Sequence, residues 1–343
     1  MEKHAWPESG NRLKLMMFDF NWCFLHPTKS DRVNPSSAHD WAFTDPQEYF
    51  NWHLEVGNNA IFLMAFTHSG YAFYPTRLGP WAPGPGSELL PRVFELTRQA
   101  GLPFYSYFCT SYDVMVNLCH DEWLIPNNRT SIWPYYLAPE SPWTDFLCER
   151  VEEFLEQFPV DVLFFDWFRY GDHKDPHPIK PAWFVEEPFQ RIIGRPMPAA
   201  AEEITPEESL RYRREVMAHQ FYRLRDTVKR ASPNTKIIFT PPYYAPAEPL
   251  WLDHPMVLES DGLLAEYAKP ETMDWLLSIR QPHQAVIATP LGPGNMPEEE
   301  MRKLLGRGCG MNGYVWGTPP ALKPHPYFHE HLDVISRVFK ETS

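Results

Sequence analysis

Two carboxylates stand where an apolar segment of the sequence opens into a polar one. Asp166 follows the run Val-Leu-Phe-Phe at 162–165, and Glu266 closes the segment 262–266. Short apolar runs bounded by polar residues are typical of strands that are buried on both faces. Placing a carboxylate at the end of such a strand costs desolvation energy, so the group is either paired or functional. A loop cap or an ion pair with Arg169 would satisfy Asp166 structurally, but the residues at the other strand ends favour chemistry.

Glycoside hydrolysis is the reaction that two facing carboxyl groups support. In a retaining enzyme, one attacks the anomeric carbon and the other protonates the leaving oxygen, which requires a raised pKa. Asp166 ends the fourth predicted strand and Glu266 the sixth, so their side chains can face each other across the mouth of a barrel. Glu259 and Asp261 are weaker candidates for the proton donor, because they precede the sixth strand and are expected at the opposite end of the barrel.

The other predicted strand ends carry further carboxylates, hydroxyls, aromatic rings and a histidine. Such a set suits a site that binds sugar hydroxyls and stacks on sugar rings. We predict substrate contacts from Asp19, Trp22, His68, Tyr71, Asp113 and Trp316. For His68 taken alone, a hydrogen bond to a loop carbonyl is the simpler interpretation. His68, Asp113 and His120 show no HxH or HExxH spacing, so we predict neither a metal nor another cofactor.

Strand-like and helix-like segments alternate along the chain and would position these side chains. The predicted strands are 13–20, 60–66, 103–109, 162–168, 236–240, 262–266, 285–289 and 313–316. The predicted helices are 46–55, 88–100, 142–157, 206–230, 249–254, 271–280, 297–306 and 327–340. Thr205, Pro206 and Glu208 together give the helix 206–230 a capping box. Eight repeats predict a closed (β/α)8 barrel, or TIM barrel, as a single catalytic domain over 1–343.

The two longest predicted connections follow the third and fourth strands, at 110–140 and 169–203. Both would lie at the C-terminal face of the barrel, where active sites of this fold are built. They hold the aromatic residues Trp133, Tyr135, Tyr136, Trp183 and Phe184, and we expect Trp143, just after the first connection, to join them. We therefore interpret these connections as walls of a substrate site. A doubly wound dinucleotide-binding fold is disfavoured, because no glycine-rich phosphate turn follows the first strand.

The composition of the chain limits the classes of partner that we expect the protein to bind. A net charge of −13 argues against nucleic acid, because phosphate binding needs basic patches. The N-terminal segment lacks the organisation of a signal peptide, and no apolar stretch reaches about 18 residues, so no membrane partner is expected. Five scattered cysteines indicate reduced thiols and a cytoplasmic protein. The aromatic-rich loops are compatible with a homo-oligomer.

Four short motifs resemble the α-L-fucosidase-related glycosidases, including the hypothetical glycosyl hydrolases of that superfamily. Residues 59–75, NAIFLMAFTHSGYAFYP, look like a second strand that ends in a histidine and continues to an aromatic-proline pair. Residues 120–123, HDEW, resemble a His-Pro-Glu-Trp element, with aspartate in place of proline. Residues 161–168, DVLFFDWF, resemble the fourth-strand motif, and 189–198, FQRIIGRPMP, the element that follows it.

This resemblance implies a (β/α)8 barrel and a retaining mechanism. It also implies Asp166 as the nucleophile and His68 as a ligand of a sugar hydroxyl. Glu266 as acid/base rests on strand geometry, because that residue varies in position within the superfamily. A single His68 stands where true α-L-fucosidases commonly have a His-His pair, and no β-sandwich is predicted after the barrel. The α-galactosidase clan also uses an aspartate on strand four and an acid on strand six, so an α-galactoside is an alternative substrate.

The sequence thus predicts a cytoplasmic, retaining exo-glycoside hydrolase for an α-linked sugar, α-L-fucose or galactose. Two alternatives belong to other classes. One is a carbohydrate-binding barrel that has lost catalysis. The other is a metal-assisted lyase or isomerase on the same fold, because fold alone does not determine function.

Overall fold

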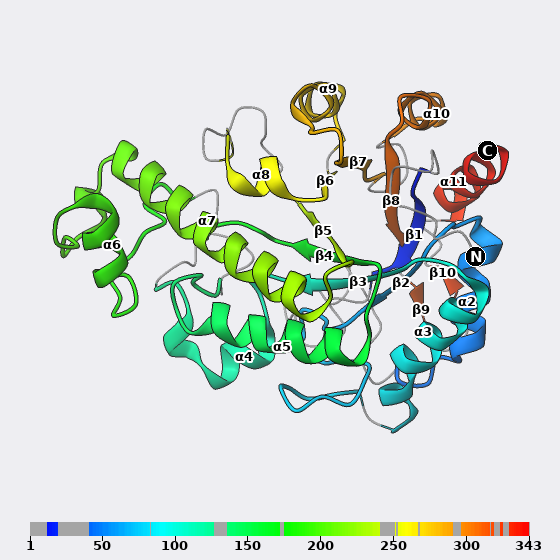
Figure 1. Ribbon diagram of the computed structural model, residues 1–343, viewed down its shortest axis with the longest axis horizontal. Helices are drawn as coiled ribbons and strands as arrows, with labels where there is room; N and C mark the ends of the chain where they lie inside the picture. The colour runs from blue at the N-terminus through cyan, green and yellow to red at the C-terminus, as the bar shows by residue number, and fades with distance from the viewer. Residues whose placement is uncertain are drawn as a thin grey trace.

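Eight parallel strands form a nearly closed barrel with helices around it (Figure 1). The computed structural model describes residues 12–19, 41–82, 84–126, 136–171, 175–240, 251, 253–266, 268–290, 296–315, 317–318, 323–324 and 329–342. The barrel strands are β1 (Lys14–Phe18), β2 (Ile61–Met64), β3 (Phe104–Cys109), β4 (Val162–Asp166), β5 (Lys236–Phe239), β6 (Gly262–Ala265), β7 (Ala285–Ala288) and β8 (Gly310–Val315). They are hydrogen-bonded in the order β1-β8-β7-β6-β5-β4-β3-β2. The predicted (β/α)8 barrel is confirmed.

Two asparagine side chains bridge the remaining edge of the barrel, between β1 and β2. Asn58 Oδ1 accepts from the Met16 amide at 2.9 Å, and Asn58 Nδ2 donates to the Met16 carbonyl at 2.8 Å. Asn59 Oδ1 accepts from the Lys14 amide at 2.8 Å, while the Asn59 amide donates to the Lys14 carbonyl at 3.0 Å. The two side-chain amides, together with the backbone amide of Asn59, thus satisfy backbone groups of β1 at this edge.

Replacing Asn58 with alanine is expected to lower the free energy of unfolding by about 2–4 kcal/mol, because it leaves buried backbone groups of Met16 without partners. Chemical denaturation measures this change. Asn51→Ala on the exposed face of the neighbouring helix is the control and should change stability far less, since the Asn51 side chain is exposed and accepts a hydrogen bond from Gln47, one turn earlier on the same helix. Equal losses in both variants would contradict a closing role for Asn58.

The helices lie between the strands in sequence and around them in space (Figure 1). Their bounds are α2 (Pro46–Val56), α3 (Leu89–Ala100), α4 (Val114–Cys119), α5 (Trp143–Gln157), α6 (Glu186–Ile193), α7 (Pro206–Ala231), α8 (Pro255–Glu259), α9 (Pro270–Ile279), α10 (Glu298–Gly306) and α11 (His329–Glu341). The predicted capping box of α7 is confirmed, with Thr205 and Glu208 satisfying each other's backbone amides. Within the described residues, no helix is long and apolar enough to cross a bilayer.

One predicted strand begins at the wrong position, and one predicted helix falls partly outside the described residues. The helix expected at 249–254 includes residues 249, 250 and 252, which lie outside them. The helix described just after it is α8, which begins at Pro255 with His254 as its N-cap, accepting from the Met256 amide. Strand β8 begins at Gly310, three positions before the predicted start at 313. A side chain at Gly310 would approach Leu13 to 2.9 Å, so the glycine permits close pairing there. Short elements inside the long connections, α4 and α6, were not predicted.

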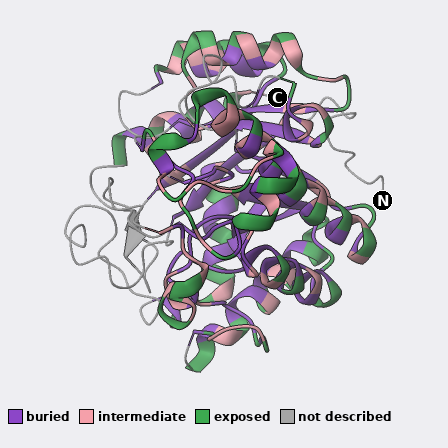
Figure 2. Ribbon diagram, turned by 90° about the vertical axis from the view of Figure 1, so that its left-hand side faces the viewer, coloured by how far each residue is buried: buried purple, intermediate pink, exposed green. Residues whose placement is uncertain are grey.

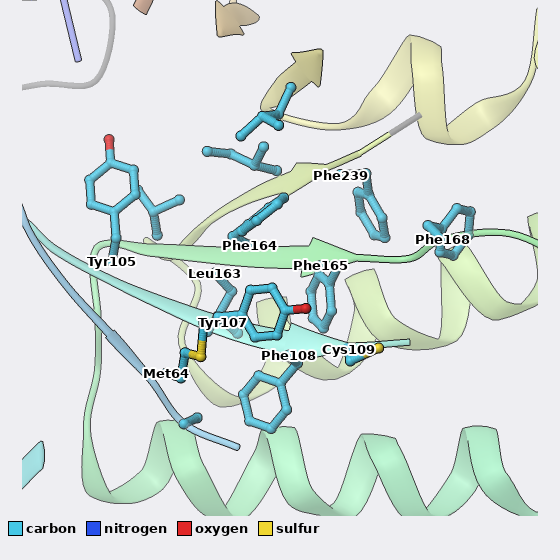
Figure 3. Close-up of a cluster of buried hydrophobic side chains, with 14 of the residues drawn as sticks. Met64, Tyr105, Tyr107, Phe108, Cys109, Leu163, Phe164, Phe165, Phe168 and Phe239 are labelled. Carbon is cyan, nitrogen blue, oxygen red and sulfur yellow. The ribbon is translucent and has the colours of Figure 1, made fainter. Parts of the chain in front are cut away.

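Alternation along the strands decides which side chains face the barrel interior. Buried residues are concentrated on the strands and on the helix faces that cover them, and exposed residues on the outer helix faces (Figure 2). On β3, Tyr107 and Phe108 point to opposite sides, and Phe108 packs on Phe154 of α5 (Figure 3). Tyr107 contacts Phe62 and Phe164, from the strands on either side. Tyr107 therefore belongs to the interior face, which leads to the C-terminal mouth of the barrel.

Candidate active site

The two predicted carboxylates lie at the same end of the barrel. Asp166 is the last residue of β4, and Glu266 follows the last residue of β6. Strand β5 lies between them and pairs with both β4 and β6. Each side chain is partly buried, and burial and then the charge of Asp166 raise the pKa of Glu266. The structure therefore brings the pair together at the mouth, as the strand count predicted.

Asp166 is surrounded by groups that stabilise its charge. Its Oδ1 accepts from the amide of Trp167 at 2.8 Å, and its Oδ2 accepts from the hydroxyl of Tyr107 at 3.0 Å. Burial raises the pKa of Asp166, while these hydrogen bonds and the nearby Arg169 guanidinium act in the opposite direction. Asp166 is thus the better stabilised anion of the pair.

Glu266 has the opposite environment. Its Oε2 is buried and has no hydrogen-bond partner among the described residues. Burial, followed by the charges of Asp166 and Asp19, raises the pKa of Glu266 well above its usual range, although Arg169 opposes this. Because two neighbouring carboxylates resist ionising together, a shared proton resides on Glu266. One buried acid and one stabilised carboxylate are the two protonation states that glycoside hydrolysis uses.

The two weaker candidates lie at the other end of β6. Glu259 ends α8, accepts from the hydroxyl of Tyr222 and forms an ion pair with Arg225 at 2.5 Å. Asp261 immediately precedes β6, where it pairs with Lys236 at 3.2 Å and accepts from the Ile237 amide. Lys236 begins β5, so this cluster lies at the N-terminal end of the barrel. The expectation that neither residue shares the mouth with Glu266 agrees with these contacts.

A tyrosine that the sequence did not single out connects two predicted site residues. Tyr107 lies two positions before the end of β3 and contacts Nε2 of His68 at 2.7 Å as well as Asp166. Alternation alone marks Tyr107 as a core residue, and only its pairing partners show that its hydroxyl reaches the mouth. His68 is buried, and burial together with Arg169 lowers its pKa to about 3. The ring is therefore neutral at physiological pH.

Trp167 and its neighbours form an aromatic wall beside Asp166. Trp167 has φ 56°, a left-handed conformation that non-glycine residues rarely adopt. Its carbonyl accepts from the hydroxyl of Ser111 and from the amide of Arg169. The guanidinium carbon of Arg169 lies 4.0 Å from the centroid of the Trp167 ring. It lies 5.4 Å from the centroid of the Tyr136 ring. This strained turn aims the Trp167 amide at Asp166.

Asp113 has structural partners for both carboxylate oxygens. Oδ1 accepts from the Val116 amide as the N-cap of α4, and Oδ2 accepts from Arg150 at 2.6 Å. Both partners of the Asp113–Arg150 pair are almost fully buried. These contacts fit a role in anchoring the connection after β3 to α5, and they give no support to Asp113 as a sugar ligand.

The other predicted contacts are distributed around the mouth. Asp19 directly follows β1, and its amide donates to the Val315 carbonyl of β8. Tyr71 is partly buried in the turn after His68. Trp22 and Trp316 lie outside the described residues. Trp143, expected in a wall of the site, is instead core, because its indole donates to the Thr110 carbonyl and is fully buried. No cluster of metal-ligating side chains occurs among the described residues.

A second buried carboxyl group lies where the two long connections meet α7. Glu140 Oε1 accepts from the hydroxyl of Tyr170 at 2.7 Å and from that of Tyr212 at 2.6 Å. Its Oε2 is buried without a hydrogen-bond partner in the described part of the chain. Burial raises the pKa of Glu140 to about 7, with the two hydroxyls opposing the shift. The neutral acid is thus the form that the fold prefers.

Raising the pH is expected to destabilise the wild type relative to a Glu140→Gln variant. A carboxyl whose pKa is raised on folding contributes stability below its unfolded pKa, and that contribution is lost as the pH rises through the folded value of about 7. Between about pH 5 and about pH 8, the difference should reach at most about 3 kcal/mol. Denaturant titrations across this range measure it, with Glu149→Gln, at an exposed position, as the control. Parallel curves for wild type and Glu140→Gln would contradict the prediction.

Comparison with known proteins gives structural matches only. No family model and no curated protein sequence matches the chain. Among solved structures, α-L-fucosidase isoenzyme 2 from Paenibacillus thiaminolyticus is similar with a TM-score of 0.67 and 13% identity, over 96% of this chain and 49% of that one. The α-L-fucosidase AlfC from Lactobacillus casei, solved with its α-L-fucose product, gives a TM-score of 0.52 and 11% identity, over 89% and 82% of the two chains.

The chain has the barrel fold of these α-L-fucosidases. It spans about half the length of the Paenibacillus protein. At such low identity the likeness is one of fold, so what the site does has to be argued from the carboxylate pair and its surroundings.

Proposed function

We propose that the barrel is a retaining exo-glycoside hydrolase that acts on α-L-fucosides. The observation that carries this proposal is the pair at the mouth, in which both oxygens of Asp166 accept hydrogen bonds and Glu266 Oε2 is buried without a partner among the described residues. Burial and the charge of Asp166 raise the pKa of Glu266, which favours its role as the acid. The fold shared with α-L-fucosidases supports fucose over galactose as the sugar. We also retain, from the sequence, the proposals of a single catalytic domain and a cytoplasmic location.

The pair divides the reaction into two displacements. In the first displacement, an oxygen of Asp166 forms a bond to the anomeric carbon while the glycosidic bond breaks. The electron pair of the glycosidic bond goes to the leaving oxygen, which takes the proton of Glu266. Water then adds to the same carbon and gives its proton to Glu266. The bond to Asp166 breaks, and its electron pair restores the carboxylate. Two inversions leave the product with the anomeric configuration of the substrate.

Binding groups around the pair would orient the sugar. Asp19 and His68 would supply polar atoms and Tyr71 a ring, as the sequence predicted. Trp22 and Trp316 stay predictions, because they lie outside the described residues. The structure adds Trp167 and Arg169, which lie beside Asp166. Aromatic faces and a few fixed polar groups are the usual lining of a sugar site. We leave Asp113 out of this set because its oxygens are used in the fold.

A panel of 4-nitrophenyl glycosides tests the proposal. Turnover of the α-L-fucoside, with proton NMR showing α-fucose as the first product, is the expected result. Turnover of the α-galactoside alone would keep the mechanism and change the sugar. Activity that a chelator abolishes would favour a metal-assisted reaction. Sugar binding by the folded protein without turnover of any glycoside would favour the carbohydrate-binding alternative and overturn the proposal.

A further inference from the structure

A chain of two hydrogen bonds runs from His68, in the turn after β2, to the carboxylate of Asp166. His68 Nε2 lies 2.7 Å from the hydroxyl of Tyr107, and that hydroxyl donates to Asp166 Oδ2 at 3.0 Å. Tyr107 and Asp166 lie on the paired strands β3 and β4, and His68 lies in the turn that follows β2, the other neighbour of β3. Both His68 and Tyr107 are buried, which limits competition from water.

The direction of each hydrogen bond follows from the charges. Tyr107 has one hydroxyl proton, and the anionic Asp166 receives it. The hydroxyl oxygen of Tyr107 must then accept from His68, so the neutral imidazole carries its proton on Nε2. His68 thus orients Tyr107, and Tyr107 donates to the carboxylate. A neutral donor fixed on an anion gives a charge-assisted hydrogen bond, which is stronger than one to a neutral acceptor.

That hydrogen bond changes strength during the proposed reaction. Asp166 is a full carboxylate in the free enzyme and a neutral ester in the glycosyl-enzyme, where it accepts more weakly. Tyr107 therefore favours the state in which Asp166 has left the sugar. We propose that Tyr107, oriented by His68, is a positioning residue that makes Asp166 a better leaving group and so speeds hydrolysis of the glycosyl-enzyme relative to its formation.

The inference rests on the proposed function and is tested with Tyr107→Phe, which keeps the ring and removes the donor. We expect hydrolysis of the intermediate to slow about tenfold relative to its formation, since a hydrogen bond to a charged group is lost. With an activated aryl α-L-fucoside, kcat and KM should fall together, and rapid mixing should reveal a burst of phenol. Mass spectrometry should show a fucosyl ester on the peptide that contains Asp166. The acidic limb of the kcat/KM profile should move to higher pH.

His68 provides a second pair of variants. The amide introduced by His68→Gln would retain a donor near the position of Nε2, whereas His68→Leu would remove it. We expect the burst in His68→Leu and a weaker one in His68→Gln, so the test survives if Tyr107→Phe does not fold.

Two outcomes overturn the inference. Folded Tyr107→Phe with a lower kcat, an unchanged KM, no burst and an unmoved acidic limb would mean that the hydroxyl only supports packing. Burst kinetics in the wild type that Tyr107→Phe abolishes would mean that the hydroxyl serves formation of the intermediate instead. Failure of the proposed function is distinct, because the wild type itself would then turn over no glycoside and form no ester on Asp166.

Discussion

Asp166→Asn is expected to lower kcat/KM for an aryl α-L-fucoside by about 10⁴-fold, or about 5 kcal/mol of barrier. The amide is nearly isosteric with the carboxylate, but it carries no charge and cannot form the glycosyl ester. Trp167 and Tyr107 each donate to one carboxylate oxygen of Asp166. The asparagine side chain has only one oxygen, so it can accept only one of these two hydrogen bonds. Some loss of orientation therefore accompanies loss of the nucleophile, and steady-state kinetics measure the sum.

Chemical rescue separates these effects. Asp166→Gly opens space for azide, which should restore part of the turnover of an activated α-L-fucoside and yield the β-fucosyl azide by a single inversion. Asp226→Asn, at an exposed position on α7, is the matched control and should retain full activity. Circular dichroism and thermal melting establish that each variant is folded. Wild-type rates in folded Asp166→Asn would remove Asp166 from the chemistry.

The strands could be predicted from the sequence because their physical signal is local. A run of apolar residues such as 162–165 has to be buried on both faces, and a parallel barrel provides that environment. The prediction failed where the reason for a boundary is not local. Strand β8 begins at Gly310, before the predicted start at 313, because the missing side chain lets Gly310 approach Leu13. The closing hydrogen bonds from Asn58 and Asn59 depend on β1 and β2 lying side by side, which no local pattern encodes.

The positions of the two candidate carboxylates on the fold were predictable for the same reason. Asp166 and Glu266 each follow an apolar run, so strand alternation alone places them at one end of the barrel. Tyr107 was not predicted, because a tyrosine inside a buried strand has the sequence signature of a core residue. Asp113 shows the reverse case, since its structural partner Arg150 lies on a helix far along the chain and could not be inferred from local sequence. Polar side chains near a strand end thus need their contacts known before roles can be assigned.

Removing the acid group is expected to have an effect that depends on the substrate. Glu266→Gln cannot protonate a leaving oxygen, so kcat/KM should fall by about 10²–10⁴-fold for natural fucosides, whose leaving groups need that proton. A 2,4-dinitrophenyl α-L-fucoside, whose leaving group departs as an anion, should lose far less in its first displacement. Comparing the two substrates in wild type and variant measures the contribution of general acid catalysis alone.

The pH dependence of kcat/KM tests independently whether Glu266 is the acid. Glu266 acts as an acid only while protonated, and burial and the charge of Asp166 raise its pKa, so wild-type kcat/KM should fall on the alkaline side at a pH above the ordinary range of glutamate. Glu266→Gln should lose this alkaline limb and keep the acidic limb, which reports ionisation of Asp166. Glu259→Gln, at the opposite end of β6, should keep both limbs. If the alkaline limb persists unchanged in Glu266→Gln, another group is the acid, because the limb must follow the residue whose proton the reaction uses.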